Sequence, residues 1–262
     1  MAPWGYSKDD GPANWYKECP IASTGERQSP VDLKASEAKH DSKLKPVVVS
    51  YPAFTDAKLL NNGHSVQFQP GAGHQSEVCG GPLATKYKFE QFHFHWGGND
   101  SEGSEHRVNG KMYPAELHLV HWNCESANYS TFKDAVGSGD PNGLCVLGFF
   151  LKVGKENTGL KPITDLFPKV KAGGSSVPIP DKYDMRAALP QALTDYYTYD
   201  GSLTTPPLAE CVKWIVFKEP IEVSAAQMAA FRALDDASGK PMVGNYRPPC
   251  PLHHRTVATS FN

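Results

Sequence analysis

The sequence predicts a mainly β protein of the α+β class, with one large sheet and a few short peripheral helices. The chain has 262 residues, and its 23 glycines and 22 prolines favour a turn-rich β protein over a helical bundle. Strand-like runs recur along the whole chain, separated by clusters of Gly, Pro, Asn and Asp. No repeat or long linker divides these runs, so we expect one domain over residues 1–262.

The expected elements follow from local composition. Runs rich in β-branched and aromatic residues predict strands over 47–51, 64–68, 86–96, 115–122, 145–153 and 211–217. Asn109-Gly110, between 105–108 and 111–113, indicates a hairpin turn. Helices are predicted over 224–234, with Ser224 as the N-cap and apolar residues at helical spacing, and over 129–136.

Composition and charge narrow the range of partners. A formal net charge of -2 argues against nucleic acid or an anionic membrane as the main partner. The longest apolar run, 144–151, is far short of the ~20 residues that span a membrane. The first residues contain no basic start and no apolar signal segment. We therefore expect a soluble, cytoplasmic protein without a membrane partner, and secretion remains the alternative if a signal peptide has been removed.

The cysteines and the glycosylation motifs bear on whether the chain is secreted. The six cysteines are scattered and form no CxxC motif, which favours buried free thiols, with disulfides as the alternative; they are Cys19, Cys79, Cys124, Cys145, Cys211 and Cys250. The sequons at Asn99 and Asn128 matter only if the chain is secreted.

The stretch QFHFHWG, residues 91–97, alternates histidine with large aromatic residues. Successive side chains of a strand point to opposite faces, so Gln91, His93 and His95 share one face. The aromatic residues at 92, 94 and 96 share the other face, and three large aromatic side chains predict that this face packs against the core. A histidine pair of this kind can be structural, exposed or metal-binding.

A second strand, 115–122, offers a third histidine. Glu116, His118 and Val120 share one face, whereas His121 lies among leucines on the other and is expected to be a hydrogen-bonded core residue. If the two strands are antiparallel neighbours, His93, His95 and His118 can converge on one point. Three imidazoles without a thiolate or carboxylate suit zinc, and the open fourth position is typical of a catalytic site.

Two polar residues on the same faces are candidates to hold these imidazoles. A metal-bound imidazole needs an acceptor for its other N–H group. Gln91 lies two residues before His93, and Glu116 lies two residues before His118. The alternative is that both are ordinary polar strand residues.

The run QFHFHWG, followed by SEHRVNGKMYPAELHLV at 104–120, closely resembles the signature of the α-class carbonic anhydrases. Further segments match the family in order along essentially the whole chain, at 4–6, 27–31, 61–64, 199–207 and 245–247. The resemblance implies a large twisted, mostly antiparallel sheet with zinc at the base of a conical cleft. It also implies reversible hydration of carbon dioxide to bicarbonate and a proton, by a cytosolic-like member.

The resemblance assigns roles that spacing alone does not. Thr204 corresponds to the threonine that accepts a hydrogen bond from zinc-bound hydroxide, and Glu105 to the glutamate that orients it. Thr205 lies near bound bicarbonate, and His64 is the proton shuttle. The water path to the shuttle is lined by Tyr6, Asn62 and Gln67. Without the resemblance, Thr204 would be part of an ordinary turn and His64 a loop-edge histidine.

The small apolar substrate requires an apolar wall beside the metal. Val120 faces the same way as His118, and the resemblance adds Val146, Leu203, Val212 and Trp214. Val146 and Val212 could equally be plain core residues. The resemblance also implies a monomer inhibited by sulfonamides and anions.

The chain also departs from the family. Secreted members usually carry a disulfide at the positions of Ser23 and Leu208, so no such bridge is expected here. Tyr246 stands where tryptophan is common, and Gln67 where some members have asparagine. The rival functions are a non-catalytic binding module with the same fold and a zinc esterase.

Overall fold

The computed structural model describes residues 4–262. The predicted domain and the predicted absence of a signal segment both begin at residue 1, so their first three residues lie outside the described part. Its strands are β1 (Asp32–Leu33), β2 (Lys39–His40), β3 (Val47–Ser50), β4 (Ala57–Asn61), β5 (Val66–Pro70), β6 (Glu77–Gly80), β7 (Tyr87–Trp96), β8 (Arg107–Val108), β9 (Ala115–Trp122), β10 (Leu144–Val153), β11 (Ser176–Pro178), β12 (Tyr196–Gly201), β13 (Val212–Val223) and β14 (Ala258–Thr259). Its helices are η1 (Pro12–Lys17), α1 (Ile21–Thr24), α2 (Phe132–Gly137), α3 (Lys161–Thr164), η2 (Phe167–Val170), η3 (Met185–Ala188) and α4 (Ala225–Arg232).

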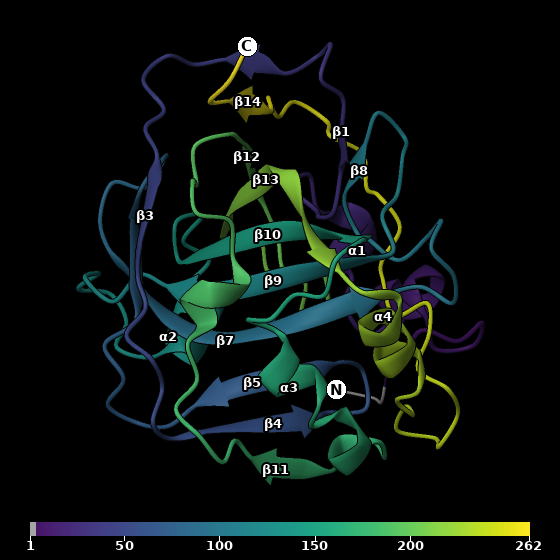
Figure 1. Ribbon diagram of the computed structural model, residues 1–262. Helices are drawn as coiled ribbons and strands as arrows, with labels where there is room; N and C mark the ends of the chain where they lie inside the picture. Colours follow the sequence, from purple (N-terminus) through teal and green to yellow (C-terminus); the bar gives the residue numbers. More distant parts are fainter. Residues whose placement is uncertain (1–3) are drawn as a thin grey trace.

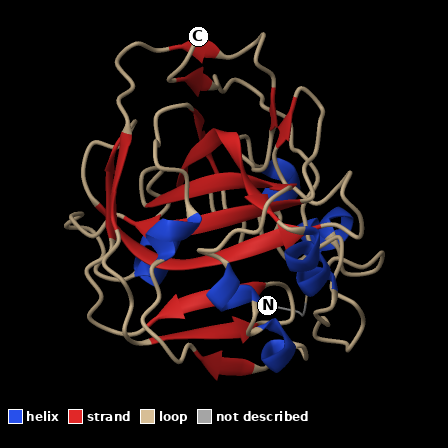
Figure 2. Cartoon of the chain, viewed as in Figure 1, coloured by secondary structure: helices blue, strands red, loops and turns tan. Residues whose placement is uncertain are grey.

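A 12-stranded sheet dominates the described chain (Figure 1). Its main path runs β11-β4-β5-β7-β9-β10-β13-β12-β14-β2, and β6 pairs with both β3 and β7. Most neighbours are antiparallel, but β10 and β13 are parallel, as are β14 and β2. The short helices lie around this sheet rather than beneath its whole area (Figure 2). The predicted fold class is confirmed.

The two faces of the central strands bury different sets of side chains. One face carries Phe92, Phe94 and Trp96 of β7, which belong to the larger hydrophobic cluster. Phe231 of α4 closes over this side, with its ring centroid 4.8 Å from that of Phe94. The other face carries a second cluster that includes Val120 of β9. The alternation therefore separates the main core from the face that carries the histidines.

The long strands agree with the sequence prediction, and the differences lie at their ends. β9 has the predicted bounds, whereas the strand predicted over 211–217 continues to Val223 as β13. Asn109 and Gly110 both have positive φ, as a tight hairpin turn requires, but a single antiparallel bridge, Val108 to Lys111, flanks them. The hairpin turn is thus present, while the strands predicted on either side are nearly absent.

The helix predictions hold with shifted bounds. α4 starts after Ser224, whose hydroxyl accepts a hydrogen bond from the backbone N–H of Gln227, as an N-cap does. The helix predicted over 129–136 starts later, as α2, after an N-cap at Thr131. Within residues 4–262, no helix is long and apolar enough to cross a membrane.

The cysteines form no disulfide within the described part of the chain. Cys19, Cys145 and Cys211 are buried, but Cys124 is exposed. The prediction of buried thiols is therefore only partly right.

Candidate active site

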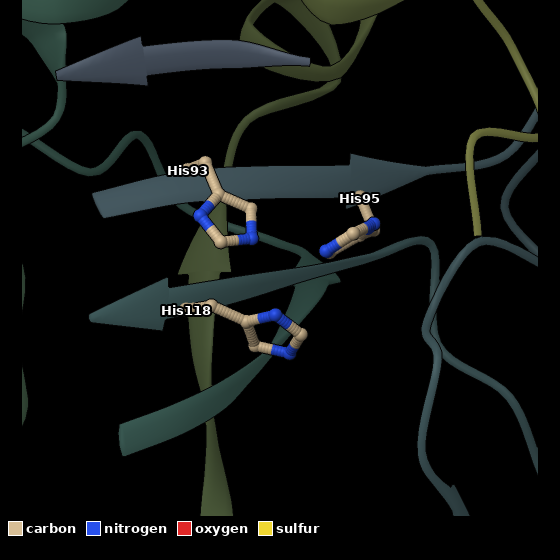
Figure 3. A group of neighbouring side chains, drawn as sticks. All are labelled: His93, His95 and His118. Carbon is tan, nitrogen blue, oxygen red and sulfur yellow. The ribbon is translucent and has the colours of Figure 1, made fainter. Parts of the chain in front are cut away.

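Strands β7 and β9 bring three histidines together on one face of the sheet. The strands are antiparallel, and His93 lies directly opposite His118 in the register. One ligand atom from each of His93, His95 and His118 lies within 4.8 Å of the others. Figure 3 shows the three imidazoles converging between the two strands. The convergence expected from the alternation of side chains is present.

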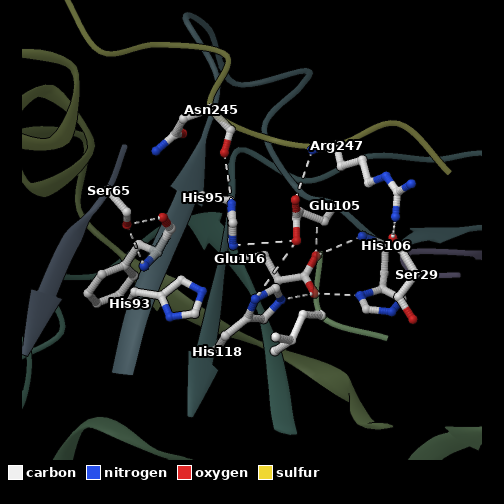
Figure 4. Close-up of polar contacts among 12 residues, drawn as sticks. Ser29, Ser65, His93, His95, Glu105, His106, Glu116, His118, Asn245 and Arg247 are labelled. Atoms are coloured by element: carbon white, nitrogen blue, oxygen red, sulfur yellow. Dashed lines mark hydrogen bonds and ion pairs between the residues drawn. The ribbon is translucent and has the colours of Figure 1, made fainter. Parts of the chain in front are cut away.

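Each imidazole is held through one ring nitrogen, which leaves the other for the centre of the cluster. His93 Nδ1 donates to Oε1 of Gln91 at 2.9 Å. His118 Nε2 donates to Oε1 of Glu116 at 2.7 Å. His95 Nδ1 donates to the backbone carbonyl of Asn245 at 2.8 Å (Figure 4). His93 and His95 therefore offer Nε2, whereas His118 offers Nδ1.

The pKa shifts favour neutral imidazoles for His93 and His95 and an ionised carboxylate for Glu116. Burial and the two neighbouring imidazoles hold the pKa of His93 well below its usual value. Burial likewise lowers the pKa of His95. For Glu116, burial raises the pKa, but His106 and His118 outweigh it, so the pKa of this carboxyl lies well below its usual range. Neutral imidazole is the form that binds a metal.

A second group that could hold a metal consists of His106, Glu116 and His118. Its polar atoms are already engaged, because His106 Nδ1 and His118 Nε2 both lie 2.7 Å from the same Glu116 oxygen. The other Glu116 oxygen accepts the backbone N–H groups of Glu105 and His106. By contrast, His95 Nε2 is buried without a hydrogen-bond partner within residues 4–262. The geometry therefore favours the three-histidine group.

An apolar wall borders the cluster on the same face. Val120 pairs across the sheet with Val146, and Val146 pairs with Trp214. The Trp214 ring lies 4.8 Å from the His118 ring. Val212 belongs to the same hydrophobic cluster, and Leu203 packs against it. The structure thus brings together all five side chains expected to form the wall.

Glu105 and Thr204 are both buried, but their expected hydrogen bond is absent among residues 4–262. Glu105 Oε1 accepts the backbone N–H of Arg247 at 2.8 Å. Its Oε2 has no hydrogen-bond partner there and lies 3.4 Å from His95 Nε2. Thr205, next to Thr204, is half-buried. Glu105 is therefore at the histidine cluster, with one oxygen available as an acceptor.

Comparison with known proteins shows which family this chain belongs to. A sequence model of the eukaryotic-type carbonic anhydrases matches residues 10–261. The chain belongs to the eukaryotic-type carbonic anhydrase family. It is 46% identical over 265 residues to carbonic anhydrase 1 of Mus musculus, covering 99% of each chain. It is 45% identical over 263 residues to carbonic anhydrase 7 of Homo sapiens, covering 98% of this chain and 97% of that relative.

Family membership confirms the expected activity class, a carbonic anhydrase (carbonate dehydratase). In this carbonic anhydrase, His64 lies in the turn before β5 rather than within the predicted strand. Asn62 Nδ2 donates to Gln67 Oε1 at 3.3 Å, and Gln67 pairs with His93 across the sheet. These polar side chains thus connect the His64 turn with the ligand face.

The His64 ring lines a cavity of mixed polar and aromatic character. It stacks on Trp4, with ring centroids 3.8 Å apart and an interplanar angle of 8°. Both line a cavity of about 360 Å³ together with Tyr6. Burial and nearby Glu105 raise the pKa of Tyr6 well above its usual value, so its hydroxyl remains protonated. The sequence prediction named Tyr6 and His64 but gave Trp4 no role.

The sequence analysis missed two contributors to the candidate metal site. The acceptor for His95 is a backbone carbonyl 150 positions along the chain, which no residue type reveals. Gly148 lies directly opposite His118 on β10, where an added Cβ would come 3.3 Å from Glu116 Oε1. A glycine in a strand can mark such a close approach, and this was the one available signal.

Proposed function

We propose that this carbonic anhydrase hydrates carbon dioxide reversibly to bicarbonate and a proton at a zinc site formed by His93, His95 and His118. The observation that carries the proposal is the convergence of three imidazoles, each oriented by an acceptor on its other ring nitrogen. Nε2 of His95 is buried, makes no hydrogen bond within residues 4–262 and lies 3.4 Å from Oε2 of Glu105. It fits a cation at this point, because a buried polar atom needs a partner.

The donor set is suited to zinc with catalytic character. Three neutral nitrogen ligands leave the charge of the cation uncompensated and the fourth tetrahedral position open. When bound, zinc lowers the pKa of its water to ~7 and so supplies a nucleophile near neutral pH, an effect for which carbonic anhydrase is the reference case. Glu116, Gln91 and the carbonyl of Asn245 fix the imidazole orientations, as metal ligands require.

The apolar wall is proposed to receive carbon dioxide. The substrate has no charge for a cationic side chain to bind, and an apolar surface removes water from its path. Val120, Val146 and Trp214 are almost completely buried in the folded chain, so their positions are fixed by packing. Leu203 is only partly buried, which fits a residue at the open side of the wall.

Thr204 and Glu105 are proposed to orient the nucleophile and bicarbonate, with Thr205 beside them. A threonine hydroxyl that donates its proton to Glu105 can only accept a second hydrogen bond, and so selects one orientation of its partner. Oε2 of Glu105, which makes no hydrogen bond within residues 4–262 and lies 3.4 Å from His95 Nε2, supports this role as the acceptor that Thr204 needs.

His64 is proposed to carry the proton to solvent, along a path lined by Tyr6, Asn62 and Gln67. Burial lowers the pKa of His64, while Asp10 and Asp236 oppose that shift, and the net pKa lies below the usual value. At neutral pH the imidazole is then mostly unprotonated and able to accept a proton. We further propose a cytoplasmic monomer that binds aromatic sulfonamides and anions at the metal site.

Stopped-flow hydration of carbon dioxide, with zinc quantified in the same sample, tests this function. We expect one zinc per chain, hydration activity and its loss with an aromatic sulfonamide. His118→Ala should lose both zinc and activity, whereas His254→Ala, which removes an exposed histidine, should keep both. A folded, zinc-loaded protein without hydration activity would contradict the proposal and favour the non-catalytic module.

A further inference from the structure

Asn245 touches both the metal ligands' strand and the His64 turn. Its backbone carbonyl accepts from His95 Nδ1 at 2.8 Å, and its side-chain Oδ1 accepts from the backbone N–H of Trp96 at 2.8 Å. Its side-chain Nδ2 donates to the backbone carbonyl of His64 at 3.0 Å. Asn245 is 1% exposed, and Figure 4 shows it beside His95 and close to Ser65. One buried amide therefore joins the backbone of His64 to that of Trp96.

The remaining anchors of the turn explain why this amide matters. Asn62 Oδ1 accepts the backbone N–H groups of His64 and Ser65, which shapes the turn, and Asn62 Nδ2 donates to Gln67 of β5. The carbonyl of Gly63 accepts the backbone N–H of Ala237. Ser65 Oγ donates to the carbonyl of Phe94 at 2.6 Å and attaches the end of the turn to β7. At His64 itself, the carbonyl is held by Asn245.

We propose that Asn245 is a positioning residue for proton transfer, whose side-chain amide holds the His64 backbone in register with the metal ligands. The inference rests on the proposed shuttle role of His64 and adds the group that places it. The backbone carbonyl of Asn245 supports His95, and its side-chain Nδ2 supports His64, while Oδ1 holds the N–H of Trp96. A side-chain substitution therefore leaves the acceptor of His95 in place.

This separation predicts a split between kinetic parameters. The ratio kcat/KM reports the interconversion of carbon dioxide and bicarbonate, whereas kcat in weak buffer reports removal of the proton. For Asn245→Ala we expect kcat in weak buffer to fall about 3- to 10-fold, a part of the ~10²-fold that a positioned proton carrier typically contributes. We expect kcat/KM to fall by a smaller factor than kcat, because the backbone acceptor of His95 stays in place while only the Trp96 N–H loses its side-chain acceptor. Added imidazole should restore kcat by supplying a mobile acceptor.

Asn157→Ala is the matched control. Asn157 has the same pattern of contacts away from the site, with Nδ2 donating to the carbonyl of Ala188 at 3.2 Å and Oδ1 accepting from the N–H of Leu160 at 2.9 Å. Its loss should leave both kinetic parameters unchanged. If Asn245 contributes only to the stability of the fold, Asn245→Ala should lower kcat and kcat/KM by the same factor. That result would overturn the inference.

His64→Ala, measured in parallel, separates this inference from the proposed function. If His64→Ala lowers kcat in weak buffer but Asn245→Ala does not, the positioning role is wrong and the shuttle stands. If His64→Ala has no effect, the shuttle is wrong and the inference falls with it.

A readout independent of turnover uses the metal-free protein. Hydrogen exchange of the backbone amides in 63–65 should be faster in Asn245→Ala than in the parent and in Asn157→Ala. If Asn245→Ala does not fold, NMR of the parent protein decides: the Asn245 side-chain amide protons should be protected from exchange. Unprotected protons, or unchanged exchange in the folded variant, would overturn the inference.

Discussion

Glu116 fixes the direction from which His118 approaches the metal site. Its two oxygens accept four hydrogen bonds, from two imidazoles and from the backbone N–H groups of Glu105 and His106. A fully engaged carboxylate cannot rotate without leaving buried donors unpaired, which is costly. His118 is thereby held with Nδ1, rather than Nε2, toward the other two histidines.

Replacing Glu116 by glutamine should weaken zinc binding. Glutamine keeps one acceptor oxygen but places an NH2 donor at the other position, so either the two imidazole N–H groups or the two backbone N–H groups lose their acceptor. The uncharged amide also holds His118 more weakly than the carboxylate does. We expect the zinc Kd to rise about 10- to 100-fold, the usual effect of losing such a support. Competition with a zinc-chelating dye measures it, with Glu222→Gln, a partly exposed carboxylate, as control. An unchanged zinc Kd would contradict the role given to Glu116.

His121 shows the opposite use of a histidine on the same strand. It is fully buried on the core face, and its Nε2 lies 2.7 Å from the hydroxyl of Tyr51, as the sequence led us to expect of a core residue. Burial lowers the pKa of His121 to about 3. Because the unfolded chain binds this proton near pH 6.5, the folded state loses stability as the pH falls from about 6.5 toward 3.

A His121→Gln variant should be less sensitive to acid than the parent. Between pH 7 and 5 the buried imidazole alone should reduce the free energy of unfolding by about 2 kcal/mol, and the variant should lack that part of the slope. Urea unfolding at the two pH values, on zinc-loaded proteins, measures the difference. Equal slopes in parent and variant would show that His121 titrates alike in the folded and unfolded chain.

At the scale of residues, alternation within two strands was enough to predict the three histidines, Gln91 and Glu116. It could not predict Asn245 as the acceptor for His95, because that contact joins distant segments through a backbone atom. The Thr204–Glu105 pair came only from the family resemblance, and their hydrogen bond is not present within residues 4–262.

At the scale of elements, β13 shows how tertiary pairing overrides a local signal. The strand was predicted to end at Phe217, three residues before Pro220, which lacks an N–H group. The strand continues instead, because its pairing with β10 shifts register between Phe149 and Leu151, opposite the segment that contains the proline. A register shift lets the ladder resume beyond a residue that cannot donate.

The N-terminus of α4 is a local feature that the sequence did predict. Ser224 and Gln227 form a capping box, with the serine hydroxyl bonded to the Gln227 N–H at 3.1 Å and the Gln227 side chain bonded to the Ser224 N–H at 3.0 Å. Ser224→Ala should lower the free energy of unfolding by about 1 kcal/mol. Denaturant unfolding measures it, with the exposed turn residue Ser42→Ala as control; equal losses would contradict the capping role.

Several strands escaped prediction because their neighbours create them. β12 pairs with β13 along its whole length, and β14 and β2 extend the sheet by two residues each. Such short strands have little periodicity of their own, so the paired strand decides their conformation.

At the scale of the whole molecule, the sheet divides the chain into a packed side and a reactive side. The phenylalanines of β7 and α4 fix the backbone from one face, while His93, His95 and His118 project from the other. We propose that the sheet unites residues 1–262 in one domain, so that metal binding on one face stabilises the whole chain.

Removing zinc should therefore lower the thermal stability of the molecule as a unit. With free zinc at 1,000 times its Kd, binding contributes about 4 kcal/mol. At roughly 2–4 °C per kcal/mol, the Tm of the metal-free protein should be lower by about 8–16 °C. Calorimetry should show one transition that moves as a whole, and none of this shift in His118→Ala. Two transitions, only one of them sensitive to zinc, would contradict the single domain.

The central claim is that zinc binds His93, His95 and His118 rather than the adjacent group of His106, Glu116 and His118. Crystallography of the zinc-loaded protein, with anomalous difference maps recorded on both sides of the zinc absorption edge, tests it directly. We predict one peak about 2.0–2.1 Å from Nε2 of His93, Nε2 of His95 and Nδ1 of His118. A peak coordinated by His106 and Glu116, with the His93 and His95 imidazoles unbound, would contradict it.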